Sequence, residues 1–326
     1  MKALKYSDIS LIPEFGQVSS RSKCDTSIKI GEKDYKLPII PANMKSVISP
    51  RHCEWMSRND YFYIMHRFDI DIFDFVLEAN DLKWPLISIS VGVQDEDKAL
   101  IEKLAEWGSP RVDFITVDIA HGYSQRMQEM LCFIREKLGK KSPIIAGNVC
   151  TPDAVVALYN WGADYVKVGI GQGSPCTTKD KTGFTMPMFS CVKKCSQCYA
   201  SRSDFNEGVR VPIIADGGVS SNGDIAKALV AGADLVMAGG LFAACSDSPA
   251  VPMDVEGTIR KAYFGSASFE NKKSHTHVEG TIKNIASNGI SLKRKMREIT
   301  EDLQSAISYG GGADLECLKN VKYVEL

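Results

Sequence analysis

The chain has 326 residues, of which 44% are hydrophobic and 24% charged, and its formal net charge is -1. This composition is typical of globular proteins, and the balanced charge argues against binding to a nucleic-acid polymer or an acidic membrane surface. No apolar run approaches the ~18 residues of a membrane-spanning helix, and no apolar signal segment is seen at the N-terminus. Ten cysteines are too few for a disulfide scaffold, so we expect reduced thiols and a cytoplasmic location.

Residues 1–36 precede the first expected strand, and we expect them to cap the bottom of the fold or to form an interface. Beyond them, eight short apolar runs recur, each continuous rather than alternating, as in parallel strands that are buried on both faces. In chain order the runs are 37–42, 61–66, 86–92, 114–118, 143–147, 165–168, 212–216 and 235–238.

Helical patterns fill the intervals between these strands. They cover 95–107, 124–138, 153–161 and 223–230, and a glycine at 162 and at 232 ends a helix just before a strand. Eight such units predict an α/β fold, a (β/α)8 TIM barrel, as a single domain over residues 1–326. The alternative is an open doubly wound sheet, which the strand count and the lack of a second domain disfavour.

Two features follow the eighth strand. Residues 241–291 are rich in Gly, Ser, Asn and Lys with weak periodicity, which is typical of a mobile flap. A helix that ends at the glycines 310–312 is then predicted by apolar residues at helical spacing, namely Leu292, Met296, Ile299, Leu303 and Ile307. The same helix carries a basic cluster that we interpret as a solvated face, formed by Lys293, Arg294, Lys295 and Arg297.

The loop after the sixth strand is the first candidate for chemistry, because barrels build their sites from the loops at the carboxyl ends of the strands. It reads Gly-Ile-Gly-Gln-Gly-Ser-Pro-Cys over residues 169–176. Its glycines permit close approach to a ligand, and its carbonyls or amides can hold a cation or an anion. Cys176 is either a nucleophile or an inert loop cysteine, and the residues alone leave both open. We reject a dinucleotide fingerprint, because the last glycine and an immediate helix are missing.

Paired glycines follow the seventh and eighth strands. Barrels often bind phosphate at these two loops, and the alternative is that the glycines only allow the backbone to turn. Asp216 can accept hydrogen bonds from ribose hydroxyls, and Asp118, after the fourth strand, can orient a cofactor amide or a ribose. His121 nearby is interpreted as a satisfied loop residue. The glycine pairs are Gly217-Gly218 and Gly239-Gly240.

Other clusters have simpler interpretations. Cys191, Cys195 and Cys198 have the spacing of one helix face, and core packing is favoured over a zinc site because no fourth ligand is near. The histidines at 275 and 277 are expected to be exposed in the polar flap. Composition gives Glu279 no special status, because a flap carboxylate is ordinarily solvated.

Seven motifs carry a resemblance to one family. In order they are Pro41-Ala42-Asn43-Met44, Asp118-Ile119-Ala120-His121-Gly122, Ala146-Gly147-Asn148-Val149, Lys167-Val168-Gly169-Ile170-Gly171, Cys176-Thr177-Thr178, Ile214-Ala215-Asp216-Gly217-Gly218 and Tyr263-Phe264-Gly265-Ser266. Together they resemble the IMP dehydrogenase / GMP reductase family over nearly the whole chain. No room exists for a regulatory (CBS) insertion between the second and third strands, and the flap is short and lacks an Arg-Tyr pair. Glu279-Gly280 stands where the reductases of the family have their catalytic glutamate, so the chain resembles that branch.

The resemblance implies NADPH-dependent reduction of GMP to IMP and ammonia by a homotetramer. It implies Cys176 as the nucleophile, attacking carbon 2 of the purine, with Thr178 and Glu279 as a proton relay. It implies a nucleotide site of Asp216, Gly217, Gly218, Gly239, Gly240, Gly265, Ser266 and Ala267. It implies a cofactor site of Asp118, Ile119, Ala120, Ile170 and Gly171. Potassium, if it binds, is expected on the carbonyls of Gly171, Gly173 and Cys176.

The chain departs from the family pattern close to the cysteine. Gln172 stands in place of a proline, and Pro175 stands where a small or β-branched residue is commoner. Lys45 and Arg67 are also unusual at their positions. We expect these changes to affect loop geometry, cation binding and nucleotide preference. Three alternatives stay open: an IMP dehydrogenase without its regulatory domain, a nucleotide-binding barrel without turnover, and a thiol or metal module on the three clustered cysteines.

Overall fold

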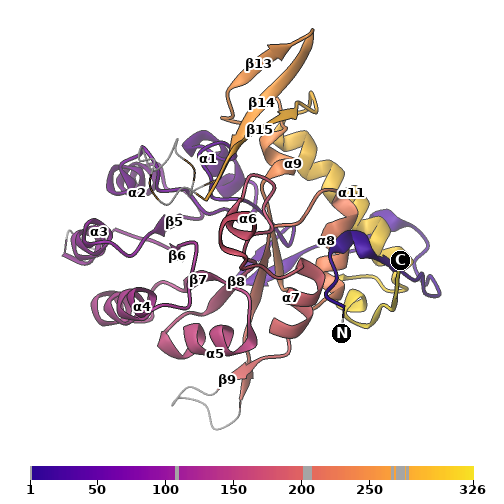
Figure 1. The fold of residues 1–326 in the computed structure, drawn as a ribbon, viewed down its shortest axis with the longest axis horizontal. Coiled ribbons are helices and arrows are strands. Elements are labelled where there is room, and N and C mark those ends of the chain that lie inside the picture. Colours follow the sequence, from indigo (N-terminus) through magenta and orange to yellow (C-terminus); the bar gives the residue numbers. More distant parts are fainter. Residues whose placement is uncertain (1, 107–109, 201–207, 266–267, 269–275, 277–278) are drawn as a thin grey trace.

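The computed structural model has a curled parallel sheet with helices packed around its outside (Figure 1). It describes residues 2–106, 110–200, 208–265, 268, 276 and 279–326. Within these residues the sheet has seven strands in the order β4-β12-β11-β8-β7-β6-β5. Their bounds are β4 (Ile39–Pro41), β5 (Ser88–Val91), β6 (Phe114–Asp118), β7 (Ile144–Val149), β8 (Tyr165–Val168), β11 (Ile213–Asp216) and β12 (Leu235–Ala238). The predicted α/β barrel architecture is confirmed.

The prediction of a strand at residues 61–66 is wrong. Only a single bridge, between Met65 and Ile89, is found there. The Met65 amide donates to the Ser88 carbonyl at 3.0 Å, but the Ser90 hydroxyl donates to the Met65 carbonyl at 2.7 Å. The apolar run is nevertheless fully buried from Phe62 to Met65, so its hydrophobicity reports burial rather than a strand.

Several helices around the sheet begin at residue types that are favoured as helix N-caps. Ser124 caps α4 through a hydrogen bond from the Met127 amide at 3.4 Å, and Thr151 caps α5 in the same way, with Pro152 in its first turn. Gly162 ends α5 with φ of 126°. The helices are α1 (Pro50–Arg58), α2 (Ile72–Asp81), α3 (Asp95–Glu106), α4 (Gln125–Leu138), α5 (Pro152–Trp161), α6 (Thr178–Thr182), α7 (Met188–Cys195), α8 (Asn222–Val230), α9 (Gly240–Ala243) and α11 (Leu292–Tyr309).

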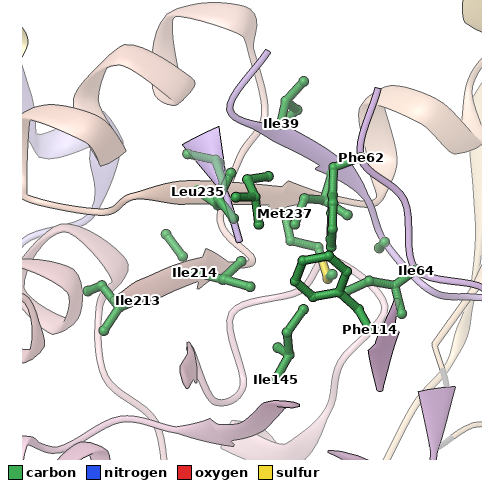
Figure 2. Close-up of a cluster of buried hydrophobic side chains, with 14 of the residues drawn as sticks. Ile39, Phe62, Ile64, Phe114, Ile145, Ile213, Ile214, Leu235 and Met237 are labelled. Atoms are coloured by element: carbon green, nitrogen blue, oxygen red, sulfur yellow. The ribbon is translucent and has the colours of Figure 1, made fainter. Parts of the chain in front are cut away.

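Large apolar side chains fill the interior of the sheet (Figure 2). Phe62 and Phe114 meet edge to face with ring centroids 4.9 Å apart. Burying side chains of this size stabilises the fold by about 1.5–3 kcal/mol each. The core therefore includes the segment that failed to form a strand. Ile39, Ile64, Ile145, Ile213, Ile214, Leu235 and Met237 belong to the same cluster.

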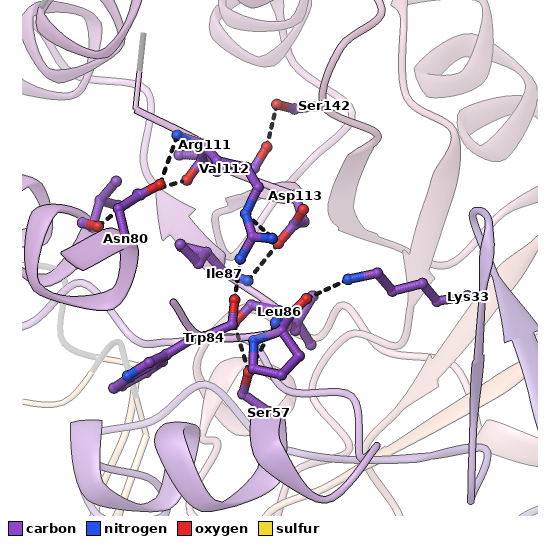
Figure 3. A network of polar contacts seen from close by, with 12 residues as sticks. Lys33, Ser57, Asn80, Trp84, Leu86, Ile87, Arg111, Val112, Asp113 and Ser142 are labelled. Atoms are coloured by element: carbon purple, nitrogen blue, oxygen red, sulfur yellow. Dashed lines mark hydrogen bonds and ion pairs between the residues drawn. The ribbon is translucent and has the colours of Figure 1, made fainter. Parts of the chain in front are cut away.

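Polar contacts fix the amino ends of β5 and β6, opposite the end where a barrel carries its site (Figure 3). The Asp113 carboxylate accepts from the Ile87 amide at 2.7 Å, just before β5 begins. The Leu86 carbonyl accepts from the Ser57 hydroxyl at 3.0 Å, and the Ser142 hydroxyl donates to the Val112 carbonyl at 2.6 Å. These bonds satisfy backbone groups that the strand ladders leave unpaired.

Within residues 2–36, one hairpin covers this amino end and one strand meets the C-terminus. The hairpin of β2 (Ile28–Ile30) and β3 (Lys33–Tyr35) contacts it, because Lys33 donates to the Pro85 carbonyl. β1 (Ile9–Leu11) pairs antiparallel with β16 (Tyr323–Glu325). The remaining short elements are η1 (Tyr6–Asp8), η2 (Arg21–Lys23), β9 (Tyr199–Ala200), β10 (Val209–Arg210) and η3 (Leu315–Asn320).

The region predicted as an irregular flap has its own sheet. β13 (Pro252–Val255), β14 (Thr258–Phe264) and β15 (Ile282–Ala286) form three antiparallel strands that project from the barrel (Figure 1). The sequence pattern did not predict these strands, because most of their residues are exposed and they contain no continuous run of buried apolar side chains. The helix predicted after the flap is confirmed as α11, and its five apolar residues are all buried. Among the described residues, no helix is long and apolar enough to cross a membrane.

Candidate active site

A cavity of about 420 Å³ opens at the carboxyl ends of the strands. Most of the residues predicted for the site line it: Asp118, Ile119, Ala120, Ile170, Gly171, Gly173, Cys176, Thr178, Asp216, Gly217, Gly239, Gly265 and Glu279. Gly218 and Gly240 do not line it. Ser266 and Ala267 lie outside the described residues. The carboxyl ends of four strands, β6, β8, β11 and β12, and the segment after β14 therefore meet at one place.

Cys176, Thr178 and Glu279 form a continuous hydrogen-bonded chain at the wall of this cavity. The Cys176 Sγ lies 3.2 Å from the Thr178 Oγ1, which donates to the Glu279 Oε2 at 2.5 Å. Thr178 is the first residue of α6, so helix geometry fixes the direction of its side chain. A thiol, a hydroxyl and a carboxylate joined in this order can move a proton along the chain.

The backbone holds this arrangement together. The Thr177 amide donates to the Glu279 carbonyl and the Thr281 amide donates to the Pro175 carbonyl, both at 2.9 Å. Cys176 and Gly280 thereby form an antiparallel bridge. Pro175 lacks an amide hydrogen, but this bridge uses only its carbonyl. The segment around Glu279 is thus tied directly to the cysteine loop.

Two glycines allow the loops to approach each other closely. A Cβ on Gly169 would lie 2.0 Å from the Asp216 carbonyl oxygen, and Gly169 has φ of 138°. A Cβ on Gly239 would lie 2.0 Å from the Tyr263 hydroxyl oxygen.

The amide of Gly218, predicted to face a phosphate, donates to the Gln172 carbonyl at 3.2 Å. In this structure that amide is engaged by the protein itself.

A buried polar cluster lies at the floor of the cavity. Lys167 Nζ lies 3.0 Å from Asp118 Oδ1 and 3.2 Å from Asp216 Oδ2. Asn43 donates to Asp118 Oδ2 at 2.8 Å, and Asn148 donates to Asp216 Oδ2 at 2.9 Å. Burial disfavours the charged forms, but the opposite charges prevail: the pKa of Lys167 is raised by both carboxylates, and the pKa of Asp118 is lowered by Lys167.

The sequence profile of the IMP dehydrogenase / GMP reductase domain matches residues 3–326. The chain belongs to the IMP dehydrogenase / GMP reductase family. Relatives named GMP reductase include one from Leptothrix cholodnii, 43% identical over 100% of this chain and 97% of that protein. Those from Staphylococcus carnosus (99% of this chain, 96% of the relative) and Mesoplasma florum (100% and 98%) are each 44% identical. The prediction that the chain is an enzyme of this family is confirmed.

Lys167, Asn43 and Asn148 were in family motifs, but sequence reasoning gave none of them a role. The signal for Lys167 was a charged residue inside the apolar run at 165–168. A lysine is almost never fully buried unless it is paired, so its position predicts carboxylate partners. The sequence alone could not name Asp118 and Asp216, because they lie 49 residues away in each direction along the chain.

The residues that depart from the family pattern have identifiable contacts. The Gln172 side chain donates to the Thr185 hydroxyl at 2.6 Å, and that hydroxyl donates to the Ile170 carbonyl at 2.8 Å. The Gly173 carbonyl, predicted as a potassium ligand, accepts from the Cys176 amide at 3.0 Å. Lys45 pairs with Asp69, and Arg67 lines the cavity. The glutamine thus braces the loop that a proline would otherwise stiffen.

The clustered cysteines are packing residues. Cys191 and Cys195 are buried on α7, whereas Cys198 is buried beyond the end of the helix. Their placement on one helix face is therefore wrong for Cys198. Burial raises its pKa to about 11, so it is a neutral thiol. Throughout the described parts of the chain, no group of three metal-ligating side chains is found. His121 is exposed, and the histidines at 275 and 277 lie outside the described residues.

Proposed function

We propose that the chain reduces GMP to IMP, with NADPH as hydride donor and release of ammonia, through a covalent intermediate on Cys176. The observation that carries the proposal is the hydrogen-bonded chain from the Cys176 Sγ through the Thr178 hydroxyl to the Glu279 carboxylate, on the wall of the cavity. The relatives named GMP reductase support the choice of substrate.

The residues match the two steps of this reaction. Carbon 2 of guanine is electrophilic, like the carbon of an amidine. The Cys176 thiolate forms a C–S bond there and the bond to the amino nitrogen breaks, which leaves a thioimidate. As the thiolate forms, the thiol proton of Cys176 passes through Thr178 to Glu279, and Glu279 returns it through Thr178 to the departing nitrogen, which leaves as ammonia. NADPH, when bound, supplies the hydride that replaces the sulfur at carbon 2. The C–S bond then breaks and Cys176 leaves as a thiolate.

The cavity suits a small-molecule ligand in contact with the cysteine. Its volume of about 420 Å³ lies within the range of small-molecule sites. Asn148 lines it, and its buried Oδ1 has no hydrogen-bond partner among the described residues. Asp216 would hold the ribose beside the glycines of the phosphate site. Asp118, Ile119, Ala120, Ile170 and Gly171 would contact the nicotinamide.

Further parts of the proposal concern the assembly. We propose one catalytic barrel domain with residues 241–291 as its flap, without a regulatory insertion, acting as a homotetramer in the cytoplasm. Potassium on the carbonyls of Gly171, Gly173 and Cys176 stays a prediction, and no step above depends on it.

The proposal is tested by following NADPH absorbance at 340 nm with GMP as the added substrate. We expect NADPH loss that depends on GMP and is accompanied by IMP and ammonia. NADH formation from IMP and NAD⁺, without GMP-dependent NADPH loss, would identify an IMP dehydrogenase instead. Failure of a thiol-alkylating purine nucleotide to label Cys176 would reject the covalent mechanism.

A further inference from the structure

Lys167 is a fully buried charge that the proposed reaction does not use. It lies on β8, in the middle of the barrel sheet, and only 1% of the residue is exposed. Its ammonium contacts one carboxylate from β6 and another from β11, Asp118 and Asp216. A buried ammonium is tolerated only when its charge and its hydrogen bonds are matched, and here two carboxylates match it.

The two carboxylates differ from Lys167 in their exposure. All three residues line the cavity, but the carboxylate side chains are 16% and 21% exposed, whereas the side chain of Lys167 is 2% exposed. Each carboxylate also accepts from one amide, Asp118 from Asn43 and Asp216 from Asn148. The ammonium therefore holds both carboxylates from their buried side, at the wall of the cavity.

Asp118 and Asp216 belong to different halves of the proposed site. Asp118 is assigned to the nicotinamide half and Asp216 to the ribose of the nucleotide. One ammonium reaches both, so any movement of Lys167 shifts both carboxylates together. Hydrogen bonds to charged groups depend strongly on geometry, and a small displacement weakens them.

We propose that Lys167 is the positioning residue that aligns the two ligands, by fixing one carboxylate for each. This inference rests on the proposed function. Lys167 does not touch the reacting atoms and acts only through Asp118 and Asp216. Its removal should therefore weaken the binding of nucleotide and dinucleotide together, rather than that of one ligand alone.

A second buried lysine in the same chain provides a matched control. Lys261 on β14 is 3% exposed, and its ammonium donates to the carbonyls of Ser246, Ser248 and Ala250 at 3.1 to 3.3 Å. Its partners are neutral backbone groups rather than carboxylates. Replacing Lys261 removes a buried ammonium of the same size without disturbing Asp118 or Asp216.

The test compares Lys167→Met with Lys261→Met by calorimetric titration of GMP alone and of NADPH alone. We expect both variants to unfold at lower temperature than wild type. In Lys167→Met both dissociation constants should rise at least about tenfold, the effect of losing one well-formed hydrogen bond to a charge. In Lys261→Met each should change less than about threefold. Unchanged binding in Lys167→Met, or equal changes in the two variants, would overturn the inference.

A second comparison applies if Lys167→Met does not fold. Lys167→Met combined with Asp118→Asn removes the ammonium and one carboxylate, which restores the charge balance of the cluster. Its dissociation constant for GMP is compared with that of Asp118→Asn alone, in which Lys167 still holds Asp216. A value at least about tenfold higher in the double variant supports the inference, and equal values refute it. Wild-type turnover of GMP is measured in parallel, because its absence would reject the proposed function and not the role of Lys167.

Discussion

The Thr178 hydroxyl donates to the Glu279 carboxylate at 2.5 Å, although 101 residues separate the two in the chain. The contact exists because the backbone around Glu279 pairs with the loop that carries Cys176. A residue of the segment after β14 thereby becomes part of the cysteine's surroundings.

Replacing the hydroxyl at position 178 tests the relay. Thr178→Val keeps the shape of the side chain but cannot pass a proton, so we expect kcat to fall at least about 100-fold, as for the loss of a general acid–base group. Thr178→Ser keeps the hydroxyl and should stay within about tenfold of wild type. The measurement is GMP-dependent NADPH oxidation at saturating substrates. Equal activity of the valine and serine variants would show that the hydroxyl carries no proton.

Glu279→Gln separates the two chemical steps. The amide cannot donate the proton that ammonia needs, so deamination of GMP should slow much more than hydride transfer. Hydride transfer can be read in reverse, by mixing IMP with NADP⁺ and following NADPH formation, because no ammonia is involved. We expect ammonia release to fall at least about tenfold further than this reverse step. A uniform loss in both assays would assign Glu279 to positioning instead.

Much of the site was predictable from the sequence because barrels place their chemistry after the strands. Cys176 follows β8, Asp118 and Asp216 are the last residues of β6 and β11, and all three line one cavity. Glu279 was identifiable only by family resemblance, since it reaches the site through a bridge between distant backbones. Lys167 was missed for a related reason, because its partners come from other strands. The hydrophobic run at 61–66 is buried from Phe62 to Met65, but it makes a single bridge, between Met65 and Ile89, instead of the expected strand.

Gly169 is expected to tolerate no side chain. Gly169→Ala would bring a Cβ to 2.0 Å from the Asp216 carbonyl oxygen, at a φ of 138° that L-residues rarely adopt. We expect a loss of at least about 2 kcal/mol in the free energy of unfolding, measured by urea denaturation. Gly223→Ala is the control, because its Cβ meets nothing closer than Ser221 Oγ at 3.8 Å. Equal stability of the two variants would contradict the packing described.

Acid should destabilise the fold through His66. Burial, and next Lys45, lower its pKa from 6.5 to about 4, and its Nδ1 accepts from the Phe68 amide at 3.2 Å. A group with a lowered folded-state pKa stabilises above its unfolded pKa and loses that contribution as pH falls. The free energy of unfolding should therefore drop between about pH 6.5 and 4, by up to roughly 3 kcal/mol.

Two substitutions assign this pH dependence. His66→Gln should reduce the fall in unfolding free energy over that interval, and the remaining fall is expected from His52, whose pKa is also lowered by burial. His121→Gln, at an exposed position, should leave the fall as in wild type. Asp118 and Asp224 also have lowered pKa values: burial would raise them, but Lys167 lowers that of Asp118 and the Ser220 amide lowers that of Asp224. The stability that these two carboxylates contribute is lost only below about pH 4. An unchanged slope in His66→Gln would show that another group titrates.

The covalent reduction of GMP is tested most directly by NADPH oxidation at 340 nm in wild type and in Cys176→Ala, with GMP binding measured on both. The account predicts equal amounts of NADPH consumed, IMP formed and ammonia released by wild type. It predicts a loss of at least about 1,000-fold in the alanine variant, with the dissociation constant for GMP changed less than about threefold. Wild-type turnover that survives in Cys176→Ala, or NADH formed from IMP and NAD⁺ with no GMP-dependent NADPH loss, would contradict it.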